Sequence, residues 1–371
     1  MIIIVFLGTI YQGDLGLYMT QKIYFSSWVY WFYFIPLPAG RLLMLVMSIN
    51  LLALSFRKSL WQFKKLGILI VHFGALLLLL GGGITAYFSY EGRMTIKEGD
   101  SSDYIEDYYI KELAFISQSE KNIIFAQDEL FKSNELEYNN ENINFDIKVL
   151  SFLANSKPIN RIENCSECRG PFQSYQLVEL KPQKEYEQNN AAAIYEISGI
   201  SDSIDGVYAS MVFEQKNNLI NIDNEQLSIK LRPKRTQVPL EITLIDFKEV
   251  LHPGTNIAKS YSSDVTLNTD DLKRNVLISM NEPLRHREYT FFQSAFNRSG
   301  QTESSTLAVV KNYGRLFPYI SSIVMCIGLL LHLSMMTIYR VSKKKVRNAK
   351  IYIFNPSIYF SKLIILIHVL F

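Results

Sequence analysis

Apolar runs alternate with polar stretches along this chain of 371 residues and divide it into membrane segments and one large polar region. The clearest run, 66–88, has no formal charge. At about 1.5 Å per residue, a helix of this length crosses a hydrocarbon core of about 30 Å. A similar run covers 316–339, and a shorter one covers 42–56, with the apolar residues 34–40 extending it outward. These runs predict membrane-spanning helices.

The first residues are harder to assign. The apolar run 1–10 is too short to cross a membrane, so we interpret it as the end of a first span that is truncated or begins upstream. No basic segment precedes it, which argues against a cleaved signal peptide. Residues 13–33 carry only Asp14 and Lys22 as charges among many aromatic residues, a composition typical of a loop at the outer membrane interface. Residues 1–56 would therefore hold a first and a second span.

The polar region, 89–315, has the size of one ordinary domain or two small ones. Its first third, to about residue 144, is acidic and polar, and beyond it apolar and polar residues alternate in short runs separated by turn residues. The alternating runs are 143–153, 206–213, 226–231, 239–250, 264–267, 288–296 and 305–310. Because helical patterns of any length are absent here, we expect a β-sandwich or an open barrel.

Basic residues predict the orientation of the spans. They gather without neighbouring acids in the loop 57–65 and again in 340–371, a basic segment that leads into the start of a further apolar segment. Basic loops stay in the cytoplasm, so 89–315 should lie outside it. The predicted fold class is a membrane protein with about four α-helical spans (the third at 66–88, the fourth at 316–339) and a large extracytoplasmic β-rich domain.

Net charge adds little to this picture. The formal charge is +3 and 20% of residues are charged, which excludes the strongly basic character of a nucleic-acid-binding protein. Membrane lipid is the expected surrounding, and nucleic acid is not an expected partner.

His72 is the first candidate functional residue, because it lies inside the run 66–88, about 10 Å along the helix from Lys65. A ring that protonates or binds metal is costly in a membrane unless something uses or satisfies it. The glycines at 81–83 would let a flat ligand or another helix approach, or would merely loosen the helix. In the structural alternative, His72 hydrogen-bonds to Asn50 or to a backbone carbonyl.

His332 lies in the run 316–339, and the helix rise places it at nearly the same depth as His72. A site between these two histidines is therefore open on geometry, although we rank it below a pairing of His72 with another protein. Packing is the commoner role for a residue such as His332. His252 and His286 have no matching catalytic pattern, and we interpret them as surface residues.

Cys165 and Cys168 form a CxxC in the region predicted to face an oxidising compartment. The pair could exchange with other thiols or supply half a metal site, but it is not a haem-attachment motif, because Arg169 stands where CxxCH requires histidine. We favour a small structural disulfide. Cys326, in the last predicted span, is expected to be an inert buried thiol.

Three segments carry a family resemblance. They are His72 with the glycines at 81–83 and the exit 91–99, then the strand block 239–265, and then 280–294, which begins MNEPL and contains a Gln-Ser pair. In this order, the segments resemble the ResB family, also called CcsB, of the System II cytochrome c biogenesis machinery.

The resemblance implies a component of a membrane complex with a CcsA-type protein, separate or fused, that carries haem b outward and attaches it to apocytochrome c. His72 matches a family histidine proposed as an axial ligand, and neutral imidazole is a good ligand for haem iron. The tryptophan-rich haem-handling motif of CcsA is absent from the chain. The chain would be a non-autonomous subunit of a holocytochrome c synthase. It would sit in the bacterial inner membrane with its large domain on the periplasmic side, and a thioredoxin-like reductant is a further candidate partner.

A second class of function remains open from the sequence. The spans could simply anchor the outer domain, which would then act as a sensor or an assembly scaffold without haem.

Overall fold

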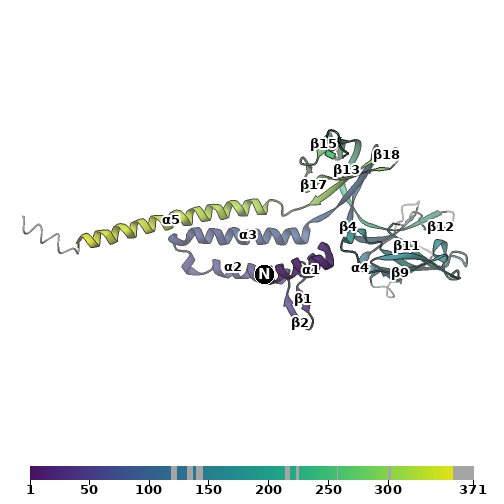
Figure 1. Ribbon diagram of the computed structural model, residues 1–371, viewed down its shortest axis with the longest axis horizontal. Coiled ribbons are helices and arrows are strands. Elements are labelled where there is room, and N and C mark those ends of the chain that lie inside the picture. The colour runs from purple at the N-terminus through teal and green to yellow at the C-terminus, as the bar shows by residue number, and fades with distance from the viewer. Residues whose placement is uncertain are drawn as a thin grey trace, which may run out of the picture. The chain divides into compact units, whose positions relative to one another are not determined.

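The computed structural model describes residues 1–117, 123–131, 137–138, 145–213, 218–222, 225–256, 258–299 and 302–353. These residues belong to two compact units that interleave along the chain. The β-rich unit combines Met1–Gly40 with Tyr90–Asn312, and the helical unit combines Arg41–Ser89 with the chain from Tyr313 onward (Figure 1).

The helical unit contains α2 (Gly40–Ser55), α3 (Leu66–Phe88) and α5 (Phe317–Ile353). Of the described helices, α3 and the part of α5 up to Lys343 are long and apolar enough to cross a membrane, whereas α2 has only 16 residues. At about 1.5 Å per residue, α2 would measure about 24 Å, which is less than a hydrocarbon core of about 30 Å. The predicted span 66–88 has the bounds of α3. The end of the predicted segment 340–371 lies outside the described residues.

The beginning of the chain differs from the sequence prediction. Helix α1 (Ile2–Thr20) continues into a π-helical turn, Gln21–Phe25, and these residues together form a third candidate span. The interpretation of 13–33 as a loop is therefore wrong for its first half, which is helical on both sides of a kink at Gly16. The expected outward extension of α2 is also wrong, because β1 (Val29–Phe32) and β2 (Ile35–Pro38) pair as a hairpin there. Three of the four predicted spans thus have the required length and composition, and α2 remains a shorter apolar helix.

Gly16 interrupts α1 with a left-handed backbone, at φ 76°. A side chain at this position would collide with the backbone carbonyl of Lys184. The glycine therefore allows α1 to lie directly against the loop that carries Lys184 in the same unit.

The β-rich unit is built from antiparallel strands. The larger sheet contains β3 (Tyr90–Lys97), β4 (Ser101–Ser117), β5 (Ile123–Ala126), β12 (Asn218–Ile222), β13 (Glu225–Leu251), β14 (Ala258–Thr269), β15 (Leu272–Ser279), β16 (Leu284–His286), β17 (Tyr289–Ser299) and β18 (Thr302–Lys311). The smaller sheet contains β6 (Glu137–Tyr138), β7 (Asp146–Leu153), β10 (Ala192–Ser198) and β11 (Gly206–Met211), while β8 (Ser156–Asn160) and β9 (Tyr175–Glu179) form a hairpin. The short helix α4 (Gln127–Leu130) follows β5. The predicted β-rich domain is confirmed, and strands β3 and β4 occupy the acidic first third that showed no strand signal.

Strands β4 and β13 form a long antiparallel pair, which we call the ribbon. Two hydrophobic cores lie along it. In the first core, the end of the larger sheet packs on β7, β10 and β11, as in a sandwich. The second core consists of residues of the larger sheet alone. This sheet curls on itself, because Ser263 of β14 donates a 2.6 Å hydrogen bond to Gln293 of β17 although four strands (β13, β4, β3 and β18) separate them in the sheet order. Both packings expected from the sequence are therefore present, one at each end of the ribbon.

A buried ion pair joins β4 to β13. The Nε atom of Arg232 lies 2.8 Å from a carboxylate oxygen of Glu112, whose side chain is only 4% exposed, and the two residues are cross-strand partners. A carboxylate so deeply buried is costly unless it is paired. Arg232 thus permits a charged residue to be buried in the ribbon, on the strand face opposite to Leu113 and Leu231 of the first core.

Glycines at seven-residue intervals form a seam between α3 and α5. A Cβ atom at Gly67 would lie 2.5 Å from the backbone nitrogen of His332, and one at Gly74 would lie 3.1 Å from the backbone nitrogen of Met325. Gly81 faces the side chain of Phe317 at the start of α5. The two helices, which run side by side in Figure 1, therefore touch backbone to backbone along this seam.

Loss of the arginine partner should strongly destabilise the β-rich unit. Arg232→Ala leaves the Glu112 carboxylate buried and unpaired, so we expect the free energy of unfolding to fall by about 3–5 kcal/mol. Denaturant unfolding of the full-length protein in detergent, followed by the β-sheet circular dichroism signal, measures this. Lys248→Ala is the control: it removes a solvent-exposed partner of Asp246 and should cause no measurable change. Equal, small effects of both substitutions would contradict the assigned role of the ion pair.

A side chain inserted into the glycine seam should separate the helices. Gly67→Leu should cost at least about 1–3 kcal/mol, the usual penalty for overpacking, and should lower the melting temperature of the detergent-solubilised protein. Gly82→Leu is the matched control, because nothing lies within 4 Å of a Cβ atom at Gly82. If the two variants melted alike, the close contact of α3 with α5 would be refuted.

Candidate functional site

His72 lies on the side of α3 that faces away from α5. Successive residues of an α-helix are about 100° apart, so His72 lies roughly 140–160° around the helix from Gly67 and Gly74. Tyr87 is on the same side as His72, and its ring contacts the guanidinium of Arg41 at the start of α2 (5.1 Å). The glycine seam therefore turns the imidazole away from the other long helix of the unit.

The Nδ1 atom of His72 is buried and has no hydrogen-bond partner among the described residues. The structural alternative, in which His72 bonds to Asn50 or to a backbone carbonyl, is therefore not seen for this nitrogen. A histidine ring inside an apolar helix is costly unless something uses or satisfies it.

The structure does not bring His332 together with His72. The backbone of His332 packs on Gly67, whereas the part of α3 near His72 is level with Met325, because Met325 contacts Gly74. Seven residues separate Met325 from His332, so the two histidines differ in depth by about 10 Å along the helix pair. The estimate of nearly equal depth therefore needs correction. The Nδ1 atom of His332 is also buried without a described partner.

The glycines at 81–83 do not form one open face. Gly81 faces Phe317 of α5, while Gly82 and Gly83 have nothing within 4 Å of a Cβ position. The segment therefore serves the helix contact on one side and is open on the other.

Cys165 and Cys168 are joined by a disulfide. Cys168 is 3% exposed and belongs to a small hydrophobic cluster with Phe172 and Tyr175, whereas Cys165 is only half-buried. The guanidinium of Arg161 approaches the Cys168 sulfur at 3.8 Å. The two sulfurs of the disulfide therefore differ in both access and charge environment.

Other predicted residues are scattered. Among the residues that the structure describes, no three His, Cys, Asp or Glu side chains gather as a metal site. His252 is exposed, as expected. His286 is half-buried, and its Nε2 atom has no hydrogen-bond partner among the described residues, so it is less exposed than expected. Cys326 is exposed on α5, which corrects the expectation of a buried thiol.

Sequence reasoning missed a bulge in the ribbon between the two cores. Pro233 pairs with Lys111 and Arg235 pairs with Glu106, so two steps along β13 correspond to five along β4. Residues 107–110 have no partner in the register between β4 and β13, although Asp107 still pairs with Gly92 of β3. This irregularity bends the ribbon.

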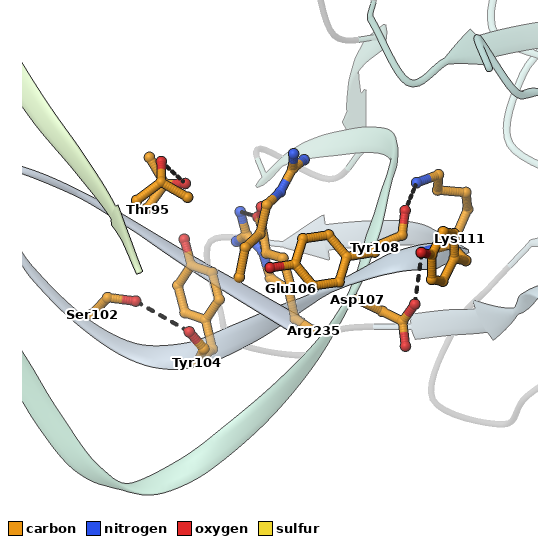
Figure 2. Close-up of polar contacts among 11 residues, drawn as sticks. Thr95, Ser102, Tyr104, Glu106, Asp107, Tyr108, Lys111 and Arg235 are labelled. Atoms are coloured by element: carbon orange, nitrogen blue, oxygen red, sulfur yellow. Dashed lines mark hydrogen bonds and ion pairs between the residues drawn. The ribbon is translucent and has the colours of Figure 1, made fainter. Parts of the chain in front are cut away.

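Asp107 holds the bulge in place. Its carboxylate, labelled in Figure 2, accepts hydrogen bonds from the backbone nitrogens of Tyr109 (2.8 Å) and Ile110 (2.9 Å). An aspartate that bonds the backbone two and three residues later is a turn signal. The Asp-Tyr-Tyr sequence could have indicated an interruption of the strand.

Glu106 is the centre of a charged group beside the bulge, as Figure 2 shows. Arg235 donates to one of its oxygens from Nε (3.2 Å) and Nη2 (3.0 Å) and stacks on the Tyr104 ring at 4.1 Å, and Arg93 approaches its other oxygen at 3.7 Å. Each charged residue of this group contacts a residue of opposite charge, so we interpret the group as a structural support of the ribbon.

The bulge also connects α1 to the rest of its unit. The Tyr18 ring stacks on Tyr109 at 3.9 Å and contacts Tyr186 at 4.6 Å. Burial raises the pKa of the Tyr109 hydroxyl, and the nearby Glu187 carboxylate raises it further. These tyrosines stay neutral and act as packing groups at the end of the candidate span.

A small cavity adjoins these tyrosines. Its volume of about 10 Å³ accommodates about one water molecule. Burial lowers the pKa of the Lys111 ammonium, and the Arg93 guanidinium lowers it further, while the Asp107 and Glu106 carboxylates oppose the shift. The lining residues are Tyr109, Lys111, Gln127, Phe152, Ala154, Tyr186, Asn189 and Ala191. This cavity is far too small for haem or for any organic substrate.

The segments that carried the sequence resemblance meet in the curled sheet. Glu98 accepts a 2.9 Å hydrogen bond from the backbone nitrogen of Phe247, which links the exit of α3 to the strand block. Gln293 contacts both Ser263 and Ser305 in a buried hydrogen-bonded group. The residues of the resemblance that lie in the strands therefore stabilise the second core, whereas His72 lies in α3.

Comparison with known proteins gives one relative with significant similarity. The chain is 24% identical over 299 residues to protein NrfI of Wolinella succinogenes. The alignment covers 78% of this chain but only 29% of NrfI, so the relative is much longer.

A family comparison covers the regions just described. The model of the ResB-like family matches residues 62–141 and 197–306, slightly more than half of the chain. His72 lies in the first matched segment, whereas Cys165, Cys168 and His332 lie outside both. The chain belongs to the ResB-like family.

Proposed function

We propose that this chain takes part in cytochrome c biogenesis, as a subunit that helps to carry haem across the membrane and to attach it to apocytochrome c. The observation that carries the proposal is the state of His72: an imidazole whose buried Nδ1 atom has no described hydrogen-bond partner, in an apolar helix, within a segment matched by the ResB-like family. Haem is the cargo and substrate of the process.

The second axial ligand would come from a CcsA-type partner. His72 faces away from α5, and the backbone of His332 packs on Gly67, so the geometry favours a ligand from outside the α3–α5 pair. The side of α3 that bears His72 is the surface on which we expect the partner and the haem to bind. Apocytochrome c would meet the complex at the β-rich unit.

In this role, the chain contributes position and ligation, and the attachment chemistry needs the partner. The glycine seam fixes the rotation of α3, and the imidazole of His72 would supply a nitrogen donor to the iron. The alternative function, an anchored sensor or scaffold without haem, predicts that no haem accompanies the purified protein.

Residues 89–315 are proposed to lie outside the cytoplasm of a bacterial cell, because the basic segments at 57–65 and beyond Arg340 should stay inside. We expect alkaline phosphatase, which requires export, to be active when fused after Leu153. A fusion after Arg57 should be inactive, which would show that α2 crosses the membrane despite its length. The reverse pattern would contradict this orientation.

Removal of the His72 ring should deplete haem. In His72→Ala, purified with the CcsA-type partner, we expect the Soret absorbance to fall at least about tenfold, since loss of even an outer-shell partner costs a metal site about 10–100-fold in affinity. The helix should still insert, because methyl is more apolar than imidazole. Imidazole added to the medium should restore part of the haem if the lost group is a ligand.

His332→Ala is the control for this prediction and should retain haem. If it lost haem as completely as His72→Ala, the two histidines of this chain would share the iron. Full haem and full cytochrome c maturation in His72→Ala would refute the ligand assignment.

A further inference from the structure

We propose that the Cys165–Cys168 disulfide is a thiol–disulfide exchange site, at which the thiol of a polypeptide attacks the Cys165 sulfur. The proposal does not depend on haem, and the two cysteines lie outside the segments matched by the family. It rests on the unequal surroundings of the two sulfurs and on the way the loop is held.

Access differs between the sulfurs. Cys165 is half-buried and follows exposed residues, including Ile162, whose side chain is fully exposed. Cys168 is 3% exposed and packs with Phe172 and Ala209. An external thiolate can therefore reach Cys165 but not Cys168.

Charge favours the departure of Cys168. The Nη2 atom of Arg161 lies 3.8 Å from the Cys168 sulfur. Two contacts hold the guanidinium there: its Nε donates to the carbonyl of Tyr175 (2.7 Å), and its plane lies over the Phe172 ring at 5.1 Å. A fixed cation beside a sulfur stabilises the thiolate form, and a stabilised thiolate leaves faster.

The loop keeps its shape without help from the disulfide. The backbone nitrogen of Arg169 donates to the carbonyl of Val207 and that of Val207 to Glu167, both at 2.9 Å, which fixes Cys168 beside β11. Gln173 donates to the carbonyl of Cys168 at 3.0 Å. A disulfide across two intervening residues removes little chain entropy, so these hydrogen bonds, and not the covalent link, define the loop. The two thiols would remain side by side after reduction.

The reaction balances with a polypeptide dithiol as co-reactant. Its first thiolate forms a bond to the Cys165 sulfur while the Cys165–Cys168 bond breaks, and the electron pair passes to Cys168 as thiolate beside Arg161. The second thiol of the polypeptide then attacks the mixed disulfide and releases Cys165. The polypeptide loses two electrons and two protons and becomes a disulfide, and the cysteine pair gains them as two thiols. The reverse sequence lets the reduced pair open a disulfide of a polypeptide.

The first test compares single-cysteine variants of the full-length protein in detergent, with Cys326→Ala as background to remove the exposed thiol on α5. Each variant is incubated with oxidised glutathione, and the mixed disulfide is measured by mass spectrometry. Cys168→Ser leaves the accessible Cys165 and should form the adduct at least tenfold faster than Cys165→Ser. After unfolding in denaturant, the two should react alike. Equal rates in the folded proteins would overturn the proposal.

The second test keeps both cysteines of the disulfide in place and so avoids disulfide variants that fail to fold. Reduced glutathione should open the disulfide of the folded Cys326→Ala protein, and Arg161→Gln should slow this reaction severalfold, with no difference between the two proteins after unfolding. A disulfide that resists glutathione until the protein unfolds is a structural crosslink, and that result would also overturn the proposal.

Discussion

The backbone contact between α3 and α5 is the constraint on which the rest of the helical unit depends. Lipid supplies no hydrophobic drive for two apolar helices to associate, so their stability has to come from close packing. Gly67, Gly74 and Gly81, which are spaced about two helical turns apart, allow this close packing because they have no side chain on the side that faces α5. Because one side of α3 is used in this way, His72 is left on the other. The same three glycines that join the helices therefore determine where the imidazole points.

The β-rich unit depends on a different device, a ribbon of two long strands that serves two cores. Paired charges keep the ribbon intact where it bends: Arg232 compensates Glu112 on one side of the bulge, and Arg235 compensates Glu106 on the other. The segments that resemble the ResB family gather in the curled sheet at one end, where Glu98 and Gln293 make hydrogen bonds between distant strands.

Some features could be predicted from the sequence because their causes are local. The run 66–88 has no charge, and the helix it forms has those same bounds. Strand β4 was missed because buried charged residues interrupt its apolar pattern, and the partner that neutralises Glu112 is 120 residues away. The direction of His72 depends on α5, which the spacing of glycines alone does not identify. The asymmetry of the disulfide likewise depends on Arg161 and on contact with β11, neither of which the CxxC motif contains.

We propose that His72 donates a nitrogen to haem iron in a complex with a CcsA-type partner. Exchange of the ligand tests this more directly than its removal, because the identity of an axial ligand determines the electronic spectrum and the electron paramagnetic resonance of ferric haem. We predict that His72→Cys, purified with the partner under mild conditions, shows the resonance of thiolate-ligated ferric haem in place of that of the native complex. A spectrum identical to that of the unsubstituted complex, with haem present in equal amount, would contradict the account.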